Sequence, residues 1–167
     1  MYGNALEGEQ LVDALVYSRL VALNSPHFDF AGSNYTERNM TGRDKDGSSK
    51  DGAGRVAFYR LTGLTHLYTV EANYNSMRAT SAAPPFSGDA AGRCAHLQGG
   101  GGPVRYDRAA FHQVGRSLLV AALDLLGHNP WSRIPGEPNE GIKGVREWVV
   151  ASVKVCSQCF CFSGCTN

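Results

Sequence analysis

Long apolar runs, net charge and a secretory leader are all lacking in this sequence of 167 residues. No apolar run approaches the roughly 18 residues of a membrane-spanning helix, and the N-terminus lacks the basic-then-apolar pattern of a secretory signal. Because 16 Lys and Arg residues nearly balance 15 Asp and Glu residues, no overall field attracts nucleic acid or a membrane surface. We therefore expect a cytoplasmic protein with one buried core.

Cysteine is scarce outside the C-terminal tail. Four of the five cysteines lie close together there, at Cys156, Cys159, Cys161 and Cys165. This arrangement is not a disulfide framework for a whole domain. Cys-x-x-Cys is a common zinc half-site, but the spacing of the four cysteines matches no complete structural site. A metal site and an unstructured terminus both remain open for this tail.

Apolar residues recur at helical spacing in three stretches. Over residues 8–23 the pattern predicts an amphipathic helix, which ends before Pro26 because the residue preceding a proline is disfavoured in a helix. A shorter apolar face predicts a helix over residues 55–62. Residues 106–126 give the strongest helical pattern, with a broad apolar stripe.

Residues 64–75 alternate with a period of two, which predicts a β-strand. Tyr68 and Val70 would lie on one face of this strand, and Thr69 and Glu71 on the other. An unpaired buried carboxylate is costly, so a glutamate within such a strand either faces water at a sheet edge or is retained for chemistry. The pattern alone leaves both interpretations of Glu71 open.

Two polar stretches separate the predicted elements. Residues 41–54 form a Gly-rich, charged loop that is too polar for a core, and residues 76–103, rich in Gly, Ala, Ser and Pro, are predicted to be an insertion with little regular structure. His27 and Asp29 are candidate metal ligands, although a histidine beside a proline turn more often has a structural role. Helices around one convincing strand predict an α/β fold whose sheet is incomplete.

Several motifs, in order along the chain, resemble those of one family. They are Leu23-Asn-Ser-Pro-His-Phe-Asp-Phe30, Asn34-Tyr-Thr-Glu-Arg-Asn-Met40, Ser49-Lys-Asp-Gly-Ala-Gly-Arg-Val56, Tyr68-Thr-Val-Glu-Ala-Asn-Tyr-Asn75 and Asn129-Pro-Trp131. Together they resemble the cytosolic carboxypeptidases, closest to the type 5 branch, which are zinc enzymes that remove glutamates from polyglutamylated proteins such as tubulin. The resemblance covers residues 1–133 and implies the C-terminal part of a metallocarboxypeptidase-type α/β domain, a mixed sheet flanked by helices. Residues 134–167 remain an unassigned, Cys-containing tail.

The resemblance implies roles for four residues. Glu71 matches the family's general acid/base glutamate, which exchanges protons with water and the leaving amine. Arg55 is the candidate partner for the substrate's glutamate side chain, since a guanidinium fork suits a carboxylate; a solvated arginine at a helix N-terminus is the alternative. Lys50 and Arg43 are further candidates for holding an acidic chain as the loop closes.

The resemblance also implies zinc, although its ligands are not found in this sequence. The family holds the metal with a His-x-x-Glu motif and a more distant His, and none of the five histidines fits this spacing. We therefore expect zinc in a full-length parent, no metal ligand in this chain, and no activity for the chain by itself.

Three functions stay open at this stage. The first is a carboxypeptidase that acts on glutamylated protein tails and is represented here by part of its domain. The second is a non-catalytic module that binds acidic tails such as those of tubulin. The third is a metal-binding interaction protein that acts through its cysteine tail. The expected partners are glutamylated tails, not nucleic acid or membrane, and association with the cytoskeleton is one option for a cytoplasmic protein of this kind.

Overall fold

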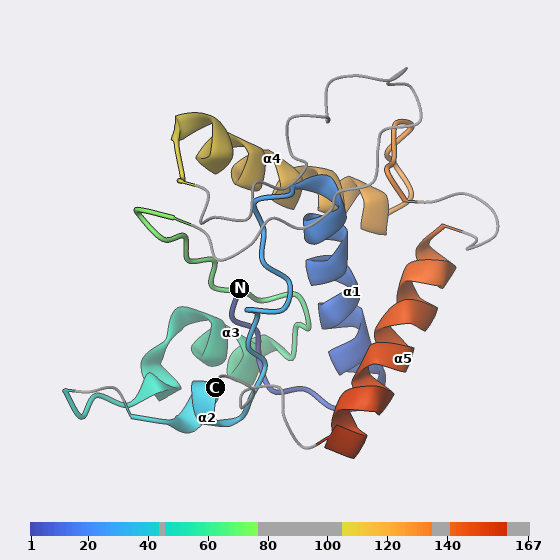
Figure 1. The fold of residues 1–167 in the computed structure, drawn as a ribbon. Helices are drawn as coiled ribbons and strands as arrows, with labels where there is room; N and C mark the ends of the chain where they lie inside the picture. The colour runs from blue at the N-terminus through green and yellow to red at the C-terminus, as the bar shows by residue number, and fades with distance from the viewer. Residues whose placement is uncertain (44–45, 77–104, 135–140, 160–167) are drawn as a thin grey trace.

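The computed structural model describes residues 1–43, 46–76, 105–134 and 141–159, and this part of the chain is largely helical. The elements in chain order are α1 (Gly8–Asn24), α2 (Arg38–Thr41), the 3-10 turn η1 (Lys50–Gly52), α3 (Gly54–Thr62), α4 (Arg108–Leu125) and α5 (Ile142–Cys159). Figure 1 shows α1 in the middle, α4 across its C-terminal end and α5 alongside it, with α2 and α3 on the far side of the N-terminal segment. The helices predicted over residues 8–23, 55–62 and 106–126 are confirmed. None of the described helices is long and apolar enough to cross a membrane.

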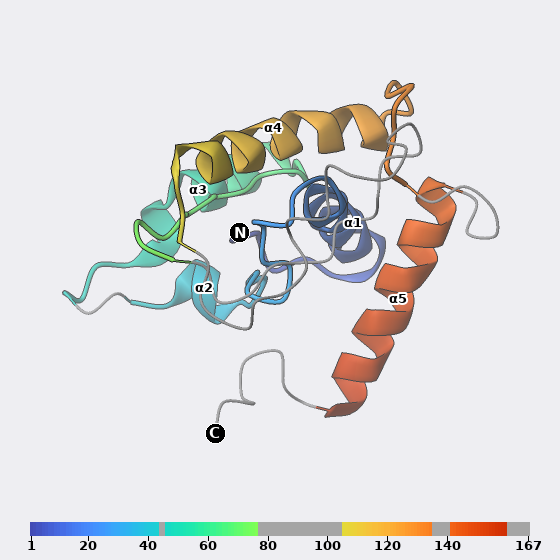
Figure 2. The same ribbon diagram turned by 45° about the horizontal axis from the view of Figure 1, so that its top comes forward.

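α1 is the most enclosed element of the described structure. Its buried side chains point in every direction around the helix and are Val12, Ala14, Leu15, Val16, Ser18, Leu20, Val21, Ala22 and Leu23. Figure 2 shows the reason, because α4 and α5 cover two sides of α1 when the helix is viewed nearly along its axis. The helix ends where the Ser25 N–H donates to the Val21 carbonyl at 3.0 Å, just before Pro26, as the sequence predicted.

α4 packs against α1 through small residues and is capped at its start. The Asp107 carboxylate accepts a hydrogen bond from the Ala110 N–H at 2.7 Å, which satisfies a backbone donor that has no partner within the helix. Ala110 and Ala121 are both buried, and Ala121 belongs to the same buried cluster as the α1 side chains. The predicted apolar stripe is broader than the buried face, because the Leu119 side chain on the opposite face is 73% exposed. At the far end, buried Asp124 accepts hydrogen bonds from the Asn24 and Asn129 amides.

α5 was not predicted from the sequence, which assigned no element to residues 134–167. Val145 and Val149 of this helix belong to the same buried cluster as α1. Arg146 pairs with both Glu9 and Asp13 of α1. The four-residue spacing of Val145, Val149 and Val153 was the available signal. The boundary at residue 133 stays a prediction, and α5 shows that regular structure continues beyond it.

The predicted strand over residues 64–75 is wrong for the described structure, in which only isolated β-bridges form. Tyr2 pairs in parallel with Asn34 and antiparallel with Thr69, exchanging hydrogen bonds of 2.8 and 2.9 Å with Thr69. Three extended segments therefore meet at Tyr2. No ladder continues from these bridges among the described residues, and the Asn4 side-chain amide donates instead to the Arg55 carbonyl at 3.2 Å. The α/β sheet predicted from the sequence is thus not found among the described residues.

The attachment of α5 to α1 gives a prediction about local stability. Val149→Ala removes apolar volume from a side chain that is 1% exposed, so it should lower the free energy of opening α5 by about 2 kcal/mol. Arg146→Ala removes partly exposed ion pairs and should cost about 1 kcal/mol or less. Amide hydrogen exchange along the helix measures both changes. A larger loss for Arg146→Ala would mean that charge, and not burial, holds α5 in place.

Candidate functional site

A cleft of about 350 Å³ lies beside α3, and we call it the arginine cleft. Its walls are Tyr2, Asn39, Lys50, Ala53, Arg55, Thr69 and Glu71. The structure thereby brings together three of the four residues predicted to form a site, namely Glu71, Arg55 and Lys50. They come from η1, the first turn of α3 and the extended segment that follows α3. Their proposed roles remain predictions, but their convergence on one cleft is a finding.

A second cleft of about 170 Å³ lies on the other side of the extended segment, and we call it the histidine cleft. Its walls are Met1, Tyr2, His27, Phe28, Asp29, Gly32, Val70, Glu71, Ala72, Tyr106 and Val114. Thr69 lines only the arginine cleft, Val70 lines only the histidine cleft, and Glu71 borders both. The two-residue alternation predicted from the sequence therefore exists locally, even without a sheet.

Arg55 is buried and holds its neighbours in place. The residue is only 7% exposed, and its Nη2 donates a hydrogen bond to the Asn39 carbonyl at 2.7 Å. The residue is therefore not a solvated arginine at a helix N-terminus. Burial lowers the pKa of the guanidinium, while the negative charge of Glu71 raises it. Arginine titrates far above neutral pH, so the group stays charged.

Two buried N–H donors in the arginine cleft have no partner among the described residues. They are Nε of Arg55 and the amide Nδ2 of Asn39. A buried donor without a partner costs about 1–3 kcal/mol, so such groups point to a ligand or water that completes them. With the ammonium of Lys50 in the same wall, the cleft offers two cationic side chains to an anion, and the unpartnered donors belong to residues of that wall. A carboxylate matches this set, since it accepts several hydrogen bonds and carries the opposite charge.

Glu71 borders both clefts and is exposed. Exposure alone fits either a general base that water can reach or a glutamate that only faces water at a sheet edge. The position of Glu71 in the wall of the arginine cleft, where its charge acts on Arg55, favours the first interpretation.

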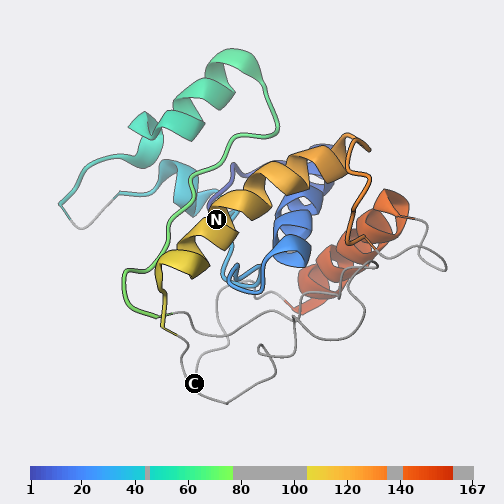
Figure 3. The same ribbon diagram turned by 90° about the horizontal axis from the view of Figure 1, so that it is seen from above.

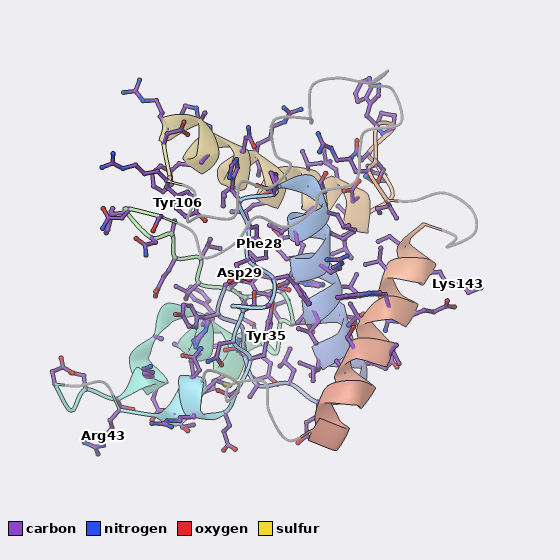
Figure 4. All side chains as sticks on the ribbon, viewed as in Figure 1. Phe28, Asp29, Tyr35, Arg43, Tyr106 and Lys143 are labelled. Atoms are coloured by element: carbon purple, nitrogen blue, oxygen red, sulfur yellow. The ribbon has the colours of Figure 1, made fainter. Side chains whose placement is uncertain are left out.

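Arg43 is not part of either cleft. It is exposed, and its Nη1 donates to the Gly47 carbonyl at 3.2 Å within the same loop. Figure 4 shows Arg43 at the outer edge of the molecule. Gly47 has a φ of 85°, a conformation that glycine adopts readily, and the turn there folds the loop back on itself. The structure therefore does not bring Arg43 together with Glu71, Arg55 and Lys50.

His27 and Asp29 both line the histidine cleft, together with Phe28 and Tyr106; Figure 4 labels Phe28, Asp29 and Tyr106. The Tyr106 hydroxyl donates to the His27 carbonyl at 2.6 Å, and Asp29 accepts from the Gly32 N–H at 2.9 Å. Among the residues that the structure describes, no group of three or more His, Cys, Asp or Glu side chains is placed to hold a metal ion. This part of the chain therefore does not fit a zinc ion.

The cysteine site cannot be placed in the same way. Cys161 and Cys165 lie outside the described residues, as do the side chains of Cys156 and Cys159 at the end of α5.

Asn39 is the site residue that the sequence analysis missed. It lies within the motif Asn34-Tyr-Thr-Glu-Arg-Asn-Met40, which contributed to the family resemblance but suggested no role for this amide. Its contribution depends on α2, a four-residue helix that turns its side chain into the arginine cleft. No spacing in the sequence indicates that contact.

No family model matches this chain. The rat protein named cytosolic carboxypeptidase-like protein 5 is 42% identical over 156 residues, which are 92% of this chain and 19% of the rat protein. The human and zebrafish proteins of that name are also 42% identical over 156 residues, which are 92% of this chain and 18% of each relative. The chain belongs to the cytosolic carboxypeptidase family. Its curated relatives carry the type 5 name, and the chain spans about a fifth of their length.

The surroundings of His27 predict its titration. Burial lowers the pKa of His27, while the charge of Asp107 and a hydrogen bond with Gln113 raise it, and the net direction is downward. The midpoint in a histidine NMR titration should therefore lie below the usual value of about 6.5. The neutral ring then stabilises the fold above that value, and this stability is lost as the pH falls through the lowered pKa.

A matched variant sharpens this titration. Asp107→Asn keeps a helix-capping residue but removes the charge that raises the pKa of His27, so the midpoint should fall further. A midpoint above the usual value in the unsubstituted chain would show instead that an acidic partner dominates.

Proposed function

We propose that the protein is a zinc-dependent metallocarboxypeptidase that removes C-terminal or branch glutamates from polyglutamylated proteins such as tubulin, and that this chain supplies the glutamate pocket and the general base. The observation that carries the proposal is the pair of unpartnered buried donors, Arg55 Nε and Asn39 Nδ2, in the cleft that Glu71 borders. The names of the relatives support the reaction class.

Recognition of the substrate follows from these donors. The side-chain carboxylate of a glutamate would accept hydrogen bonds from Arg55 and Asn39 and remove the cost of leaving them unpaired. Lys50 in the same wall adds a positive charge. A neutral side chain of the same shape would give up the charged interaction with the guanidinium, so a site of this kind discriminates against it.

Glu71 supplies proton transfer in the proposed reaction. Its exposed carboxylate accepts a proton from the water that attacks the scissile carbonyl, and later delivers that proton to the nitrogen of the departing amine as the C–N bond breaks. Arg55 and Glu71, whose charges act on each other, thus have different roles: the arginine binds the substrate carboxylate, and the glutamate transfers the proton.

The zinc that the family resemblance implies is proposed to be bound outside the described residues, since these hold no suitable cluster. For the same reason we propose that the chain alone is inactive. We also propose that the complete protein acts in the cytoplasm, where it can associate with the cytoskeleton.

The sheet expected for this family is also part of the proposal. Tyr2 pairs in parallel with one neighbour and antiparallel with the other, which is the pairing of a mixed sheet. We propose that these three extended segments become strands of that sheet in the complete domain.

A non-catalytic module that binds acidic tails is the second candidate. The favouring observation is that the arginine cleft has its recognition groups in place, whereas the described residues contain no metal-binding cluster. Turnover of a glutamate-ending peptide by the full-length protein separates the two candidates.

Replacing the base should abolish turnover and spare binding. Glu71→Gln keeps the shape and the hydrogen bonding of the side chain but cannot accept the proton. We expect kcat of the full-length protein to fall by about a hundredfold to ten-thousandfold, with the affinity for a glutamate-ending peptide nearly unchanged. Steady-state kinetics and peptide binding test this. An unaltered kcat would remove Glu71 from the mechanism.

Replacing the cation should change specificity. Arg55→Ala in the full-length protein should weaken kcat/KM for a peptide ending in Glu by about 2–5 kcal/mol, because the substrate carboxylate loses its charged partner. A peptide ending in Gln should lose much less. Arg55→Lys serves as the control, since it keeps the charge without the fork. If both peptides slow equally, Arg55 is structural only, and the acidic specificity lies with Lys50, Arg43 or another part of the protein.

A further inference from the structure

A row of basic residues marks the outward face of the first half of α4. Arg108, His112 and Arg116 are exposed and spaced four residues apart, which places them on one side of the helix, and exposed Arg105 comes just before it. Ala110 on the opposite side of the helix is buried. We call Arg105, Arg108, His112 and Arg116 the basic stripe.

The basic stripe holds three arginines and only one neighbouring carboxylate, Asp107, within residues 105–116. None of its residues takes part in a salt bridge with another described residue. Asp107, the carboxylate that lies within the stripe's own sequence, is engaged as the helix cap with the Ala110 N–H. Arg108 and Arg116 lie two turns apart on the same side of the helix, so both can face one acidic partner. The stripe thus favours an acidic partner.

The basic stripe begins where the Glu71 segment ends. Tyr106, between Arg105 and α4, borders the histidine cleft together with Glu71. Its N–H donates to the Asn75 carbonyl at 3.0 Å, and Ser76 forms a β-bridge with Arg105. Figure 3 shows the segment that follows α3 reaching the start of α4. A substrate peptide that extends from Glu71 along this segment would therefore reach the basic stripe.

The length of the stripe matches a short extended peptide. Arg108 and Arg116 are separated by two turns of helix, or about 12 Å. An extended polypeptide covers that distance with about four residues. A tail carrying several acidic residues before its cleaved end would therefore place carboxylates along the whole stripe.

We propose that the basic stripe is a second binding site for the acidic residues that precede the cleaved glutamate in a substrate tail. The inference rests on the proposed function and adds to it a preference for long acidic tails. Each exposed arginine contributes only about two- to threefold in affinity, and salt screens this contribution. The effect should therefore appear in KM and not in kcat, because the stripe does not touch the bond that is cleaved.

The test compares two peptides on the full-length protein. One has about three residues and the other about eight, mostly Glu, both with the same C-terminal Glu; the longer one reaches the stripe when extended. Arg108→Ala with Arg116→Ala removes two charges and leaves the Asp107 cap and the helix intact, since alanine favours helix. Arg133→Ala with Lys143→Ala is the matched control, because these cations lie beyond the other end of α4 and on α5, where Figure 4 labels Lys143.

We expect the Arg108/Arg116 variant to raise KM for the long peptide about fivefold, to change it less than twofold for the short peptide, and to lose the difference at high salt. The control should match the unsubstituted protein. Equal weakening of both peptides, no change for the long peptide, or an equal effect in the control would each overturn the proposal.

Binding of labelled peptides to the Glu71→Gln form provides a readout that needs no turnover. If the protein cleaves neither peptide but binds the long one through the stripe, the basic stripe is supported and the carboxypeptidase function fails. If both peptides are cleaved and the Arg108/Arg116 variant binds them as the unsubstituted protein does, the function stands and the stripe is refuted.

Discussion

α1 carries apolar side chains around most of its circumference, so most of its surface cannot face water without cost. The other elements are arranged to meet this need. α4 crosses one end of it through small alanines, and α5 covers a second side through Val145 and Val149. The N-terminal segment enters the same cluster through Met1. This segment carries Tyr2, which borders both clefts, so the packing of α1 also places the walls of the site.

The arginine cleft shows how a buried charge is retained at moderate cost. A guanidinium removed from water needs hydrogen bonds and a counter-charge. The Asn39 carbonyl supplies one hydrogen bond to Arg55, and Glu71 supplies an opposing field. One donor nitrogen still lacks a partner among the described residues. The hydrogen bonding of the buried guanidinium is therefore incomplete, as a binding site requires, because an arginine with all of its donors paired could donate no hydrogen bond to a ligand.

The sequence predicted what depends on local pattern and missed what depends on distant contacts. The helices over residues 8–23, 55–62 and 106–126 followed from apolar periodicity. The strand over residues 64–75 failed because a ladder needs partners, and Tyr2 offers only single pairings on each side. α5 was missed because its apolar residues sit beside the cysteines. The resemblance selected Glu71, Arg55 and Lys50, which share a cleft, but no pattern pointed to Asn39, whose amide matters only through the fold.

The single pairing of Tyr2 with Thr69 has a consequence for how this chain tolerates changes in length. Since Thr69 lines only the arginine cleft and Val70 only the histidine cleft, the number of residues between Thr69 and Glu71 determines which side chain lies beside Arg55. One residue inserted between Thr69 and Glu71 would bring Val70 or its neighbour beside Arg55 and turn the carboxylate away. Insertions are tolerable in the loop after α2, but here a change of one residue would replace an acidic wall with an apolar one.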